Sequence, residues 1–190
     1  MGKNRLEAFS DGVIAILITI MVLELKVPHG EGWDALQSLL PVFLTYLLSF
    51  VILAIYWNNH HHLLHAVQQI NGSVLWANMH LLFWLSLVPF VTGWMEENHF
   101  TRLPVASYGT VLIGAACAYY ILVRTLVRQQ SKNAALAAAI GNDFKGKISI
   151  AIYAIGIALA FVHTMLSCAA YALVSVIWLI PDRRIEKSIH

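Results

Sequence analysis

The amino-acid sequence predicts an all-α integral membrane protein with six transmembrane helices, formed by residues 1–190 as a single domain. The first observation is composition: 59% of the residues are hydrophobic, 12% are charged, and the mean hydropathy is +0.69. This balance leaves too little polar surface for a soluble protein of this size. The second is that apolar runs long enough to cross a bilayer recur along the chain. The net charge is only +2, which does not favour nucleic acid as a partner.

Six apolar segments are predicted to cross the membrane, because each has roughly the 17–25 residues needed to span the hydrocarbon core. Pro89 lies inside the third segment and is expected to bend it, since proline cannot donate to the helical backbone ladder. Pro28, Pro104 and Pro181 fall at segment ends, where helices tolerate proline. The predicted segments are Leu6–Val27, Leu36–His62, Val74–Trp94, Leu103–Val127, Lys147–His163 and Thr164–Ile180.

The last two segments form one apolar run, and the charge distribution decides how to divide it. A tight hairpin at His163 and Thr164 gives six crossings and places ten of the 12 Lys and Arg residues on one side. By the positive-inside rule that side is the cytoplasm, so both termini of this multi-pass protein are predicted on the cytoplasmic side of the cell's inner membrane. The ten residues are Lys3, Arg5, Arg124, Arg128, Lys132, Lys145, Lys147, Arg183, Arg184 and Lys187, against Lys26 and Arg102 outside.

A charged residue at the start of the first segment is the most informative feature of the chain. Asp11 follows Phe9 and Ser10, and Arg5 precedes Phe9 by about one helical turn. A carboxylate in a membrane span is costly unless it is paired or hydrogen-bonded, so Asp11 indicates a structural or functional site. Ser and Asp are also common helix caps, because their side chains accept hydrogen bonds from first-turn N–H groups. From the residues alone, both interpretations stay open.

The pattern Arg-x-x-x-Phe-Ser-Asp that begins at Arg5 resembles the first-helix motif of the transmembrane protein 175 family of potassium channels. A Trp and two His residues at the inner end of the second segment are similar to the region that supports the motif in that family. The chain has one copy of the motif, so it resembles the prokaryotic single-repeat members, which assemble as homotetramers in the lipid bilayer. The expected motif and helix-packing network consists of Arg5, Phe9, Ser10, Asp11, Trp57, His60 and His61.

The resemblance implies a moderately selective potassium channel whose pore is lined by four copies of the first helix and has no carbonyl selectivity filter. The pore constriction is expected at Ile16, Ile20 and Leu23, and a ring of Thr19 is expected to supply selectivity. Helix geometry agrees, because at about 100° per residue these four side chains lie within about 60° of Ile16. Aliphatic residues at this spacing also commonly pack against other helices or lipid. Asp11 falls about 220° from Ile16 and should point into the helix bundle.

The alternative function is a small proton-coupled membrane transporter that uses Asp11 and the histidines as a proton relay. The cluster from His60 to His65 could bind a divalent metal, but hydrogen bonding at the cytoplasmic boundary is favoured over metal binding. Sensitivity to pH near neutrality is an open consequence of the hydrogen-bonding role. The chain is not expected to be an enzyme or to hold a metal or cofactor, because no nucleophile with a plausible base and no complete ligand set stands out. Potassium ions are the expected permeant partner.

Overall fold

The computed structural model describes residues 2–67, 69–129 and 144–179, and within these ranges the chain forms helices and turns with no β-strand. Each predicted apolar segment coincides with helix over its described residues, so the all-α class is confirmed. Ile180, the predicted end of the last segment, lies outside the described residues. The helices are α1 (Lys3–Leu23), α2 (Trp33–Ser38), α3 (Leu40–His65), α4 (Gly72–Ser86), α5 (Val88–Glu97), α6 (Arg102–Gln129), α8 (Phe144–Ala160) and α9 (Thr164–Leu179).

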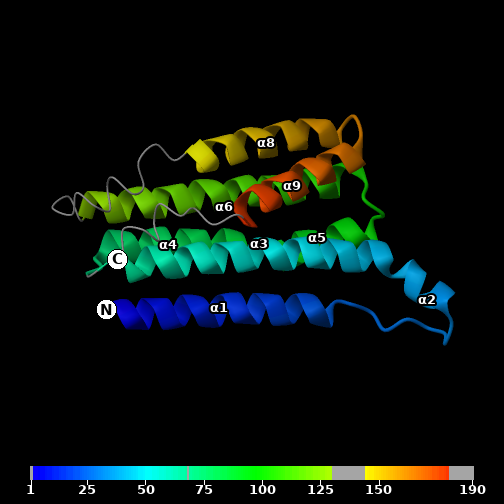
Figure 1. Cartoon of the computed structure of the whole chain (residues 1–190), viewed down its shortest axis with the longest axis horizontal. Helices are drawn as coiled ribbons and strands as arrows, with labels where there is room; N and C mark the ends of the chain where they lie inside the picture. The colour runs from blue at the N-terminus through cyan, green and yellow to red at the C-terminus, as the bar shows by residue number, and fades with distance from the viewer. Residues whose placement is uncertain (1, 68, 130–143, 180–190) are drawn as a thin grey trace.

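Among the described residues, four parts of the chain are long and apolar enough to cross a membrane by length and composition: α1, α3, α4 with α5, and α6. The remaining pair is shorter, with 17 residues in α8 and 16 in α9. These two helices pack together as an antiparallel pair joined by a short turn that ends at His163 (Figure 1). The predicted hairpin at His163 and Thr164 is therefore confirmed, while the count of six crossings stays a prediction.

Prolines divide two of the predicted segments. Pro89 has no N–H to donate to the carbonyl of Leu85, and the third segment is split there into α4 and α5. The predicted bend at Pro89 is thus confirmed. Pro41 lies in the first turn of α3, and the separate helix α2 precedes it. The predicted single segment Leu36–His62 is therefore wrong at its start, because it begins inside a different short helix.

The end of the first segment also differs from the prediction. Helix α1 begins before Leu6 and ends at Leu23, with Glu24 as its C-cap, so the predicted boundary at Val27 is wrong. The reason is local. Pro28 disfavours the helical conformation of the residue before it, and charged Glu24 and Lys26 favour leaving the apolar layer.

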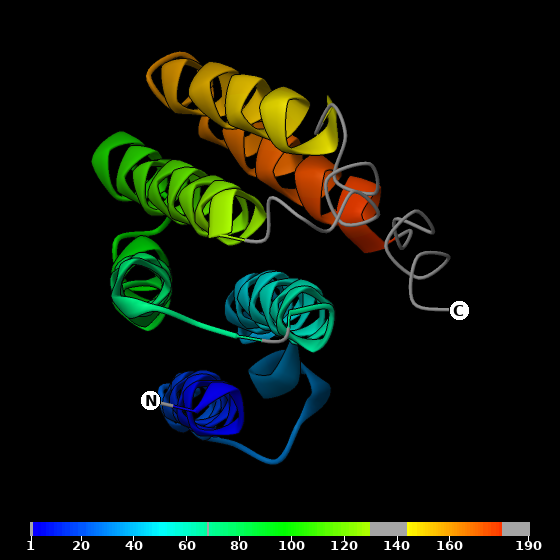
Figure 2. The same cartoon turned by 90° about the vertical axis from the view of Figure 1, so that its left-hand side faces the viewer.

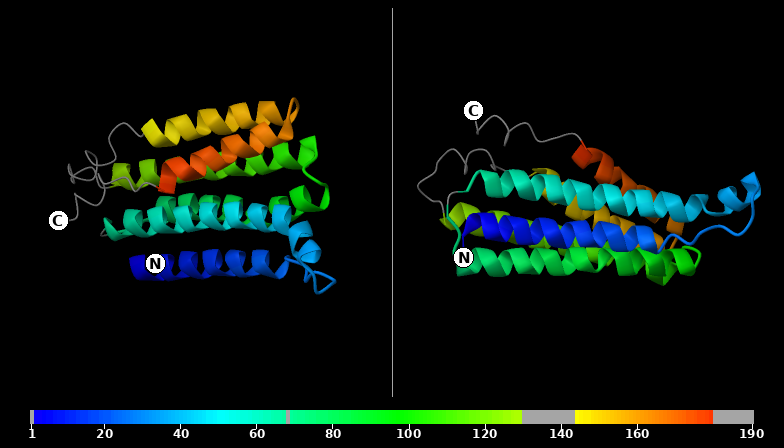
Figure 3. Two further views of the ribbon diagram at one scale, coloured as in Figure 1. Left: turned by 45° about the vertical axis from the view of Figure 1, so that its right-hand side comes forward. Right: turned by 90° about the horizontal axis from the view of Figure 1, so that it is seen from below.

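Helix α1 lies at one edge of the bundle. It packs against α3, α4 and α5, whereas α6, α8 and α9 form the opposite side (Figures 1 and 2). Seen from below, α1 lies between α3 and the line of α4 and α5 (Figure 3). One side of α1 is therefore packed against its own chain, and the other faces away from the described helices.

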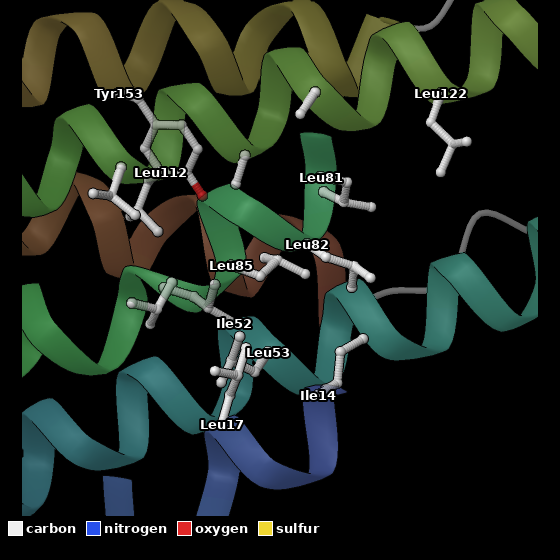
Figure 4. Packing of buried hydrophobic residues seen from close by; sticks show 14 of the residues in the cluster. Ile14, Leu17, Ile52, Leu53, Leu81, Leu82, Leu85, Leu112, Leu122 and Tyr153 are labelled. Carbon is white, nitrogen blue, oxygen red and sulfur yellow. The ribbon is translucent and has the colours of Figure 1, made fainter. Parts of the chain in front are cut away.

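The hydrophobic core is continuous from α1 to α9. Ile14 and Leu17 of α1 enter the same cluster as Leu53 of α3 and Leu82 of α4 (Figure 4). Farther from α1, small residues allow the helices to approach closely. A side chain on Gly114 of α6, for example, would overlap the indole of Trp84 on α4, so glycine is required at that crossing. Contacts with three helices therefore hold α1 in place from one side.

Candidate functional site

The predicted pore residues all lie on the exposed face of α1. Ile16 is 59% exposed, Ile20 42% and Leu23 77%, and Thr19 is exposed beside them. Buried positions recur every three or four residues, as expected for a helix with one packed side. They are Leu6, Ser10, Ile14, Leu17 and Met21. The exposed row is consequently available to lipid or to other copies of the chain.

Thr19 is the hydroxyl-bearing residue of this exposed row. Its Oγ1 donates a hydrogen bond to the carbonyl oxygen of Ala15, one turn earlier, at 2.9 Å. A hydroxyl has one proton and two lone pairs, so this bond uses the proton and leaves the oxygen able to accept or to coordinate. The side chain is thereby oriented as an oxygen ligand rather than as a donor, which suits a cation.

An antiparallel ladder of polar contacts joins the N-terminal half of α1 to the C-terminal end of α3. Its three rungs are one helical turn apart on each helix, because positions four residues apart share a helix face. We call this the α1–α3 ladder. Its rungs are Lys3 Nζ to the His65 carbonyl oxygen at 3.2 Å, His61 Nδ1 to Glu7 Oε1 at 3.2 Å, and Trp57 Nε1 to Asp11 Oδ1 at 2.9 Å.

The ladder explains where Asp11 points. The carboxylate accepts a hydrogen bond from the indole of Trp57, so it lies on the α3 side of α1, away from Ile16. Ser10 and Asp11 are inside the helix, whose N-cap is Gly2, and the capping alternative is therefore wrong. Lys3 and Glu7 were not predicted as site residues. Their spacing of four from one another and from Asp11 is the signal that could have identified them.

A second, fully buried network joins α1 to both α4 and α3. Ser10 Oγ donates to the Leu6 carbonyl oxygen at 2.9 Å and accepts from Asn78 Nδ2 at 3.0 Å. The Asn78 carbonyl oxygen lies 2.7 Å from His60 Nε2, so that ring nitrogen is the donor. Ser10, Asn78 and His60 are each 0% exposed. Sequence reasoning missed Asn78, although an amide inside an apolar helix is itself a signal, because buried polar groups require partners.

The remaining histidines of the cluster contribute to packing. His61 lies between Trp57 and His65, with ring centroids 5.9 Å from each. Across the described ranges, no group of three or more His, Cys, Asp or Glu residues is placed to hold a metal ion. Hydrogen bonding and stacking thus account for the geometry of this cluster.

Two residues of the predicted network lie apart from it. Arg5 is exposed, and Phe9 is 46% exposed. Both fall within about 20° of Ile16 around the helix axis, on the exposed row rather than on the side of Ser10 and Asp11. Within one chain the motif therefore divides between the two faces of α1.

The C-terminal end of α1 borders an open cavity of about 640 Å³. Leu17 and Ile20 form part of its wall, opposite residues of α5. Carboxylates gather on it, among them Glu24 and Glu96, and Lys26 pairs with Glu97 at 3.7 Å. The cavity therefore carries net negative charge beside the exposed row, which favours cations over anions.

Comparison with known proteins connects these features to a family. Residues 5–89 match the family model described as endosomal/lysosomal potassium channel TMEM175. A potassium channel of Chryseobacterium sp. (strain P1-3) is 56% identical over 189 residues, which cover 100% of this chain and 98% of that protein. A potassium channel of Streptomyces collinus is 30% identical, covering 91% of this chain and 89% of that protein.

The fold is similar to that of a solved member of the same group. The crystal structure of a lysosomal potassium-selective channel TMEM175 homolog from Chamaesiphon minutus matches with a TM-score of 0.81 and 26% sequence identity. The match covers 95% of this chain and 97% of that one. The agreement therefore extends from α1 through the α8–α9 hairpin and is not confined to the motif.

Proposed function

The chain belongs to the TMEM175 family of potassium channels, and from this premise we propose that it forms a homotetramer with one central pore lined by α1. Potassium ions would pass along the exposed row of four copies of this helix. The family also makes an enzymatic function implausible, since its members are ion channels.

The observation that carries the proposal is the exposed row itself. Ile16, Ile20 and Leu23 leave large apolar surfaces uncovered along one face of a helix whose other face is firmly packed. Four such faces around an axis form stacked aliphatic rings. A narrow apolar ring gives an ion nothing to replace its hydration shell and closes by dewetting, so a small widening would switch conduction on.

Selectivity in this proposal comes from Thr19. Four copies would place four hydroxyl oxygens in one ring, each with its proton engaged by Ala15 and its lone pairs turned to the pore. Such a ring lies one turn from the Ile16 and Leu23 rings. It can coordinate a partly dehydrated cation and so discriminate moderately between potassium and sodium.

Thr19→Ala should therefore reduce the permeability ratio of potassium to sodium by roughly fivefold, the factor for ~1 kcal/mol of lost differential coordination. The measurement is the reversal potential of the purified channel in a planar bilayer under opposed potassium and sodium gradients. Thr110→Ala is the matched control, because Thr110 on α6 is also exposed and donates to Ala106 at 2.9 Å. An unaltered reversal potential in Thr19→Ala would reject the role of Thr19.

We propose that all six segments cross the membrane, with both termini in the cytoplasm and α8 and α9 as the last two spans. The α8–α9 turn would then reach the outer surface, where Val162 is 77% exposed. After replacement of Cys117 and Cys168, Val162→Cys should react with an impermeant maleimide on intact cells, and Arg128→Cys should react only after permeabilisation. The reverse pattern would invert the orientation.

The alternative function, a proton-coupled transporter, predicts a different kind of flux. It requires proton movement in step with potassium, which a pH-sensitive dye inside the same vesicles would detect. The Asp11 carboxylate accepts a hydrogen bond from the Trp57 indole, and the His60 ring is hydrogen-bonded to the Asn78 amide. These bonds do not connect Asp11 to His60, so they give no direct proton-transfer step between the two. A channel should instead give potassium flux that does not saturate and moves no stoichiometric proton.

A further inference from the structure

The open cavity beside the C-terminal end of α1 is large enough to hold a small molecule. Its volume of about 640 Å³ lies within the ~300–1,000 Å³ that is typical of ligand sites. Leu17 and Ile20 form one side, Leu39 and Val42 lie at the start of α3, and Pro89 is on the α5 side. An apolar group inside the cavity would therefore contact apolar surface from three helices.

Two aromatic rings of α5 border the same cavity. Phe90 and Trp94 are one turn apart, and their rings stack with centroids 6.0 Å apart and planes 22° from parallel. Phe90 is 65% exposed, so the described helices leave most of it uncovered. The faces of aromatic rings attract cations, and quaternary ammonium ligands in particular are bound in this way.

Acidic side chains give the cavity a net negative charge. Glu24, Glu96 and Glu97 line it together with one basic residue, Lys26. Lys26 Nζ pairs with Glu97 Oε1 at 3.7 Å, whereas Glu24 and Glu96 form no ion pair within the described part of the chain. Glu96 is half-buried, where salt screens a charge less than at an open surface. A bound cation would therefore balance carboxylates that the protomer leaves unpaired.

An organic cation uses these features better than a metal ion does. A divalent metal requires several protein ligands, and the described ranges place no group of three or more His, Cys, Asp or Glu residues to supply them. A hydrated ion would also gain nothing from the apolar wall. An ammonium ion with alkyl groups would place its charge near the carboxylates and rings and its carbon atoms against Leu17 and Val42.

We propose that this cavity binds a hydrophobic organic monocation of the tetraalkylammonium class, with its charge beside Glu24 and Glu96 and its alkyl groups against the apolar wall. The binding goes beyond ion conduction and depends on the walls of one protomer. The cavity shares Ile20 with the exposed row, so the bound cation would lie beside the expected constriction and obstruct potassium. That consequence, unlike the binding, rests on the proposed function.

Binding of tritiated tetrabutylammonium to the full-length protein in phosphatidylcholine nanodiscs tests the site without measuring flux. A scintillation proximity assay at pH 8 keeps the carboxylates ionised and reports only protein-bound label. The wild type should bind saturably. Unlabelled tetrabutylammonium should displace the label at a concentration at least tenfold lower than tetraethylammonium, because its longer alkyl groups bury more apolar surface.

The double substitution Glu24→Gln with Glu96→Gln should weaken this binding by roughly 20-fold, because each carboxylate contributes a factor of about five. Glu31→Gln with Asp34→Asn is the matched control. It removes the same charge at two exposed positions outside the cavity wall, and it should leave the affinity unchanged. Equal affinities of the two double variants would overturn the proposal.

A glycine of the wall permits a test of the cavity itself. A Cβ on Gly93 would meet no atom within 4 Å, so Gly93→Leu can fill part of the cavity without straining the helix. It should weaken binding at least tenfold. Gly72→Leu is the control, because a Cβ there also meets open space but lies outside the cavity, and it should bind as the wild type does.

Three further results would overturn the site: equal behaviour of the two leucine variants, no preference for tetrabutylammonium over tetraethylammonium, and no saturable binding by the wild type. The last is expected if a neighbouring copy of the chain fills the cavity. Potassium flux into vesicles is measured separately. Saturable binding that leaves the flux unchanged would support the site and count against Ile20 as a pore-lining residue, so the two proposals can fail independently.

Discussion

Replacing Ile16 with Asn should raise potassium flux into vesicles that contain the purified protein by about tenfold or more, equivalent to a barrier lower by ~1.4 kcal/mol. In the proposed pore, the apolar ring would resist ions because it offers no hydrogen bonds to replace water. An amide at each of four positions would supply donors and acceptors at the narrowest point, so water and ions could remain there. The effect is expected to be large because the change would be repeated four times around the axis of the proposed tetramer.

The chain offers a closely matched control for this experiment. Ile155 on α8 is the same residue type with nearly the same exposure, 58% against 59% for Ile16. Ile155→Asn should therefore introduce the same amide at a lipid-facing position without opening a path. An equal rise in both variants would mean a non-specific leak. Unchanged flux in a well-folded Ile16→Asn variant would remove Ile16 from the constriction.

Asp11→Ala should have the second large effect, a loss of assembled protein. The substitution removes the acceptor for Trp57 Nε1 and breaks the last rung of the α1–α3 ladder. Trp57 is 42% exposed, and losing its hydrogen bond to a charged acceptor costs ~1.5–3 kcal/mol. The orientation of α1 about its own axis would then no longer be fixed relative to α3. The exposed row would therefore face neighbouring copies at variable angles. The measurements are the thermal midpoint in detergent and the oligomeric mass from light scattering.

Conservative variants separate the hydrogen bond from the charge. Asp11→Asn keeps a side-chain carbonyl oxygen for Trp57, so it should reduce stability and assembly less than Asp11→Ala. Trp57→Phe removes the donor, and its effect should not add fully to that of Asp11→Ala, because both substitutions break the same contact. Intact tetramers with altered conductance in Asp11→Ala would contradict the assignment of Asp11 to helix packing and favour a direct role in permeation.

The composition and the spacing of apolar runs were sufficient to predict the all-α class and a helix at each segment. The hairpin at His163 and the bend at Pro89 were also predictable, because charge balance and the missing proline N–H act locally. The separate helix α2 and the early end of α1 were not predicted. Pro41 interrupts a run that remains apolar on either side, which hydropathy alone does not register. The end of α1 depends on Glu24, Lys26 and Pro28 together, whose combined effect sets a boundary only to within a few residues.

For the candidate site, periodicity along α1 was enough to group Ile16, Ile20, Leu23 and Thr19 on one face and to place Asp11 on another. A helical period says which residues share a face, since it depends on backbone geometry alone. It does not say which face its own chain covers. That was decided by the tertiary structure, which packs α3, α4 and α5 against the side of Ser10 and Asp11 and leaves the row with Ile16 uncovered.

The sequence by itself therefore determined the class, the segments and the two faces of α1, because these follow from local geometry and from the transfer of apolar side chains into lipid. The tertiary structure alone decided the partners. Asn78 beside Ser10 and Glu7 beside His61 join residues far apart in the chain. Such contacts depend on how helices approach one another, which no single helix encodes.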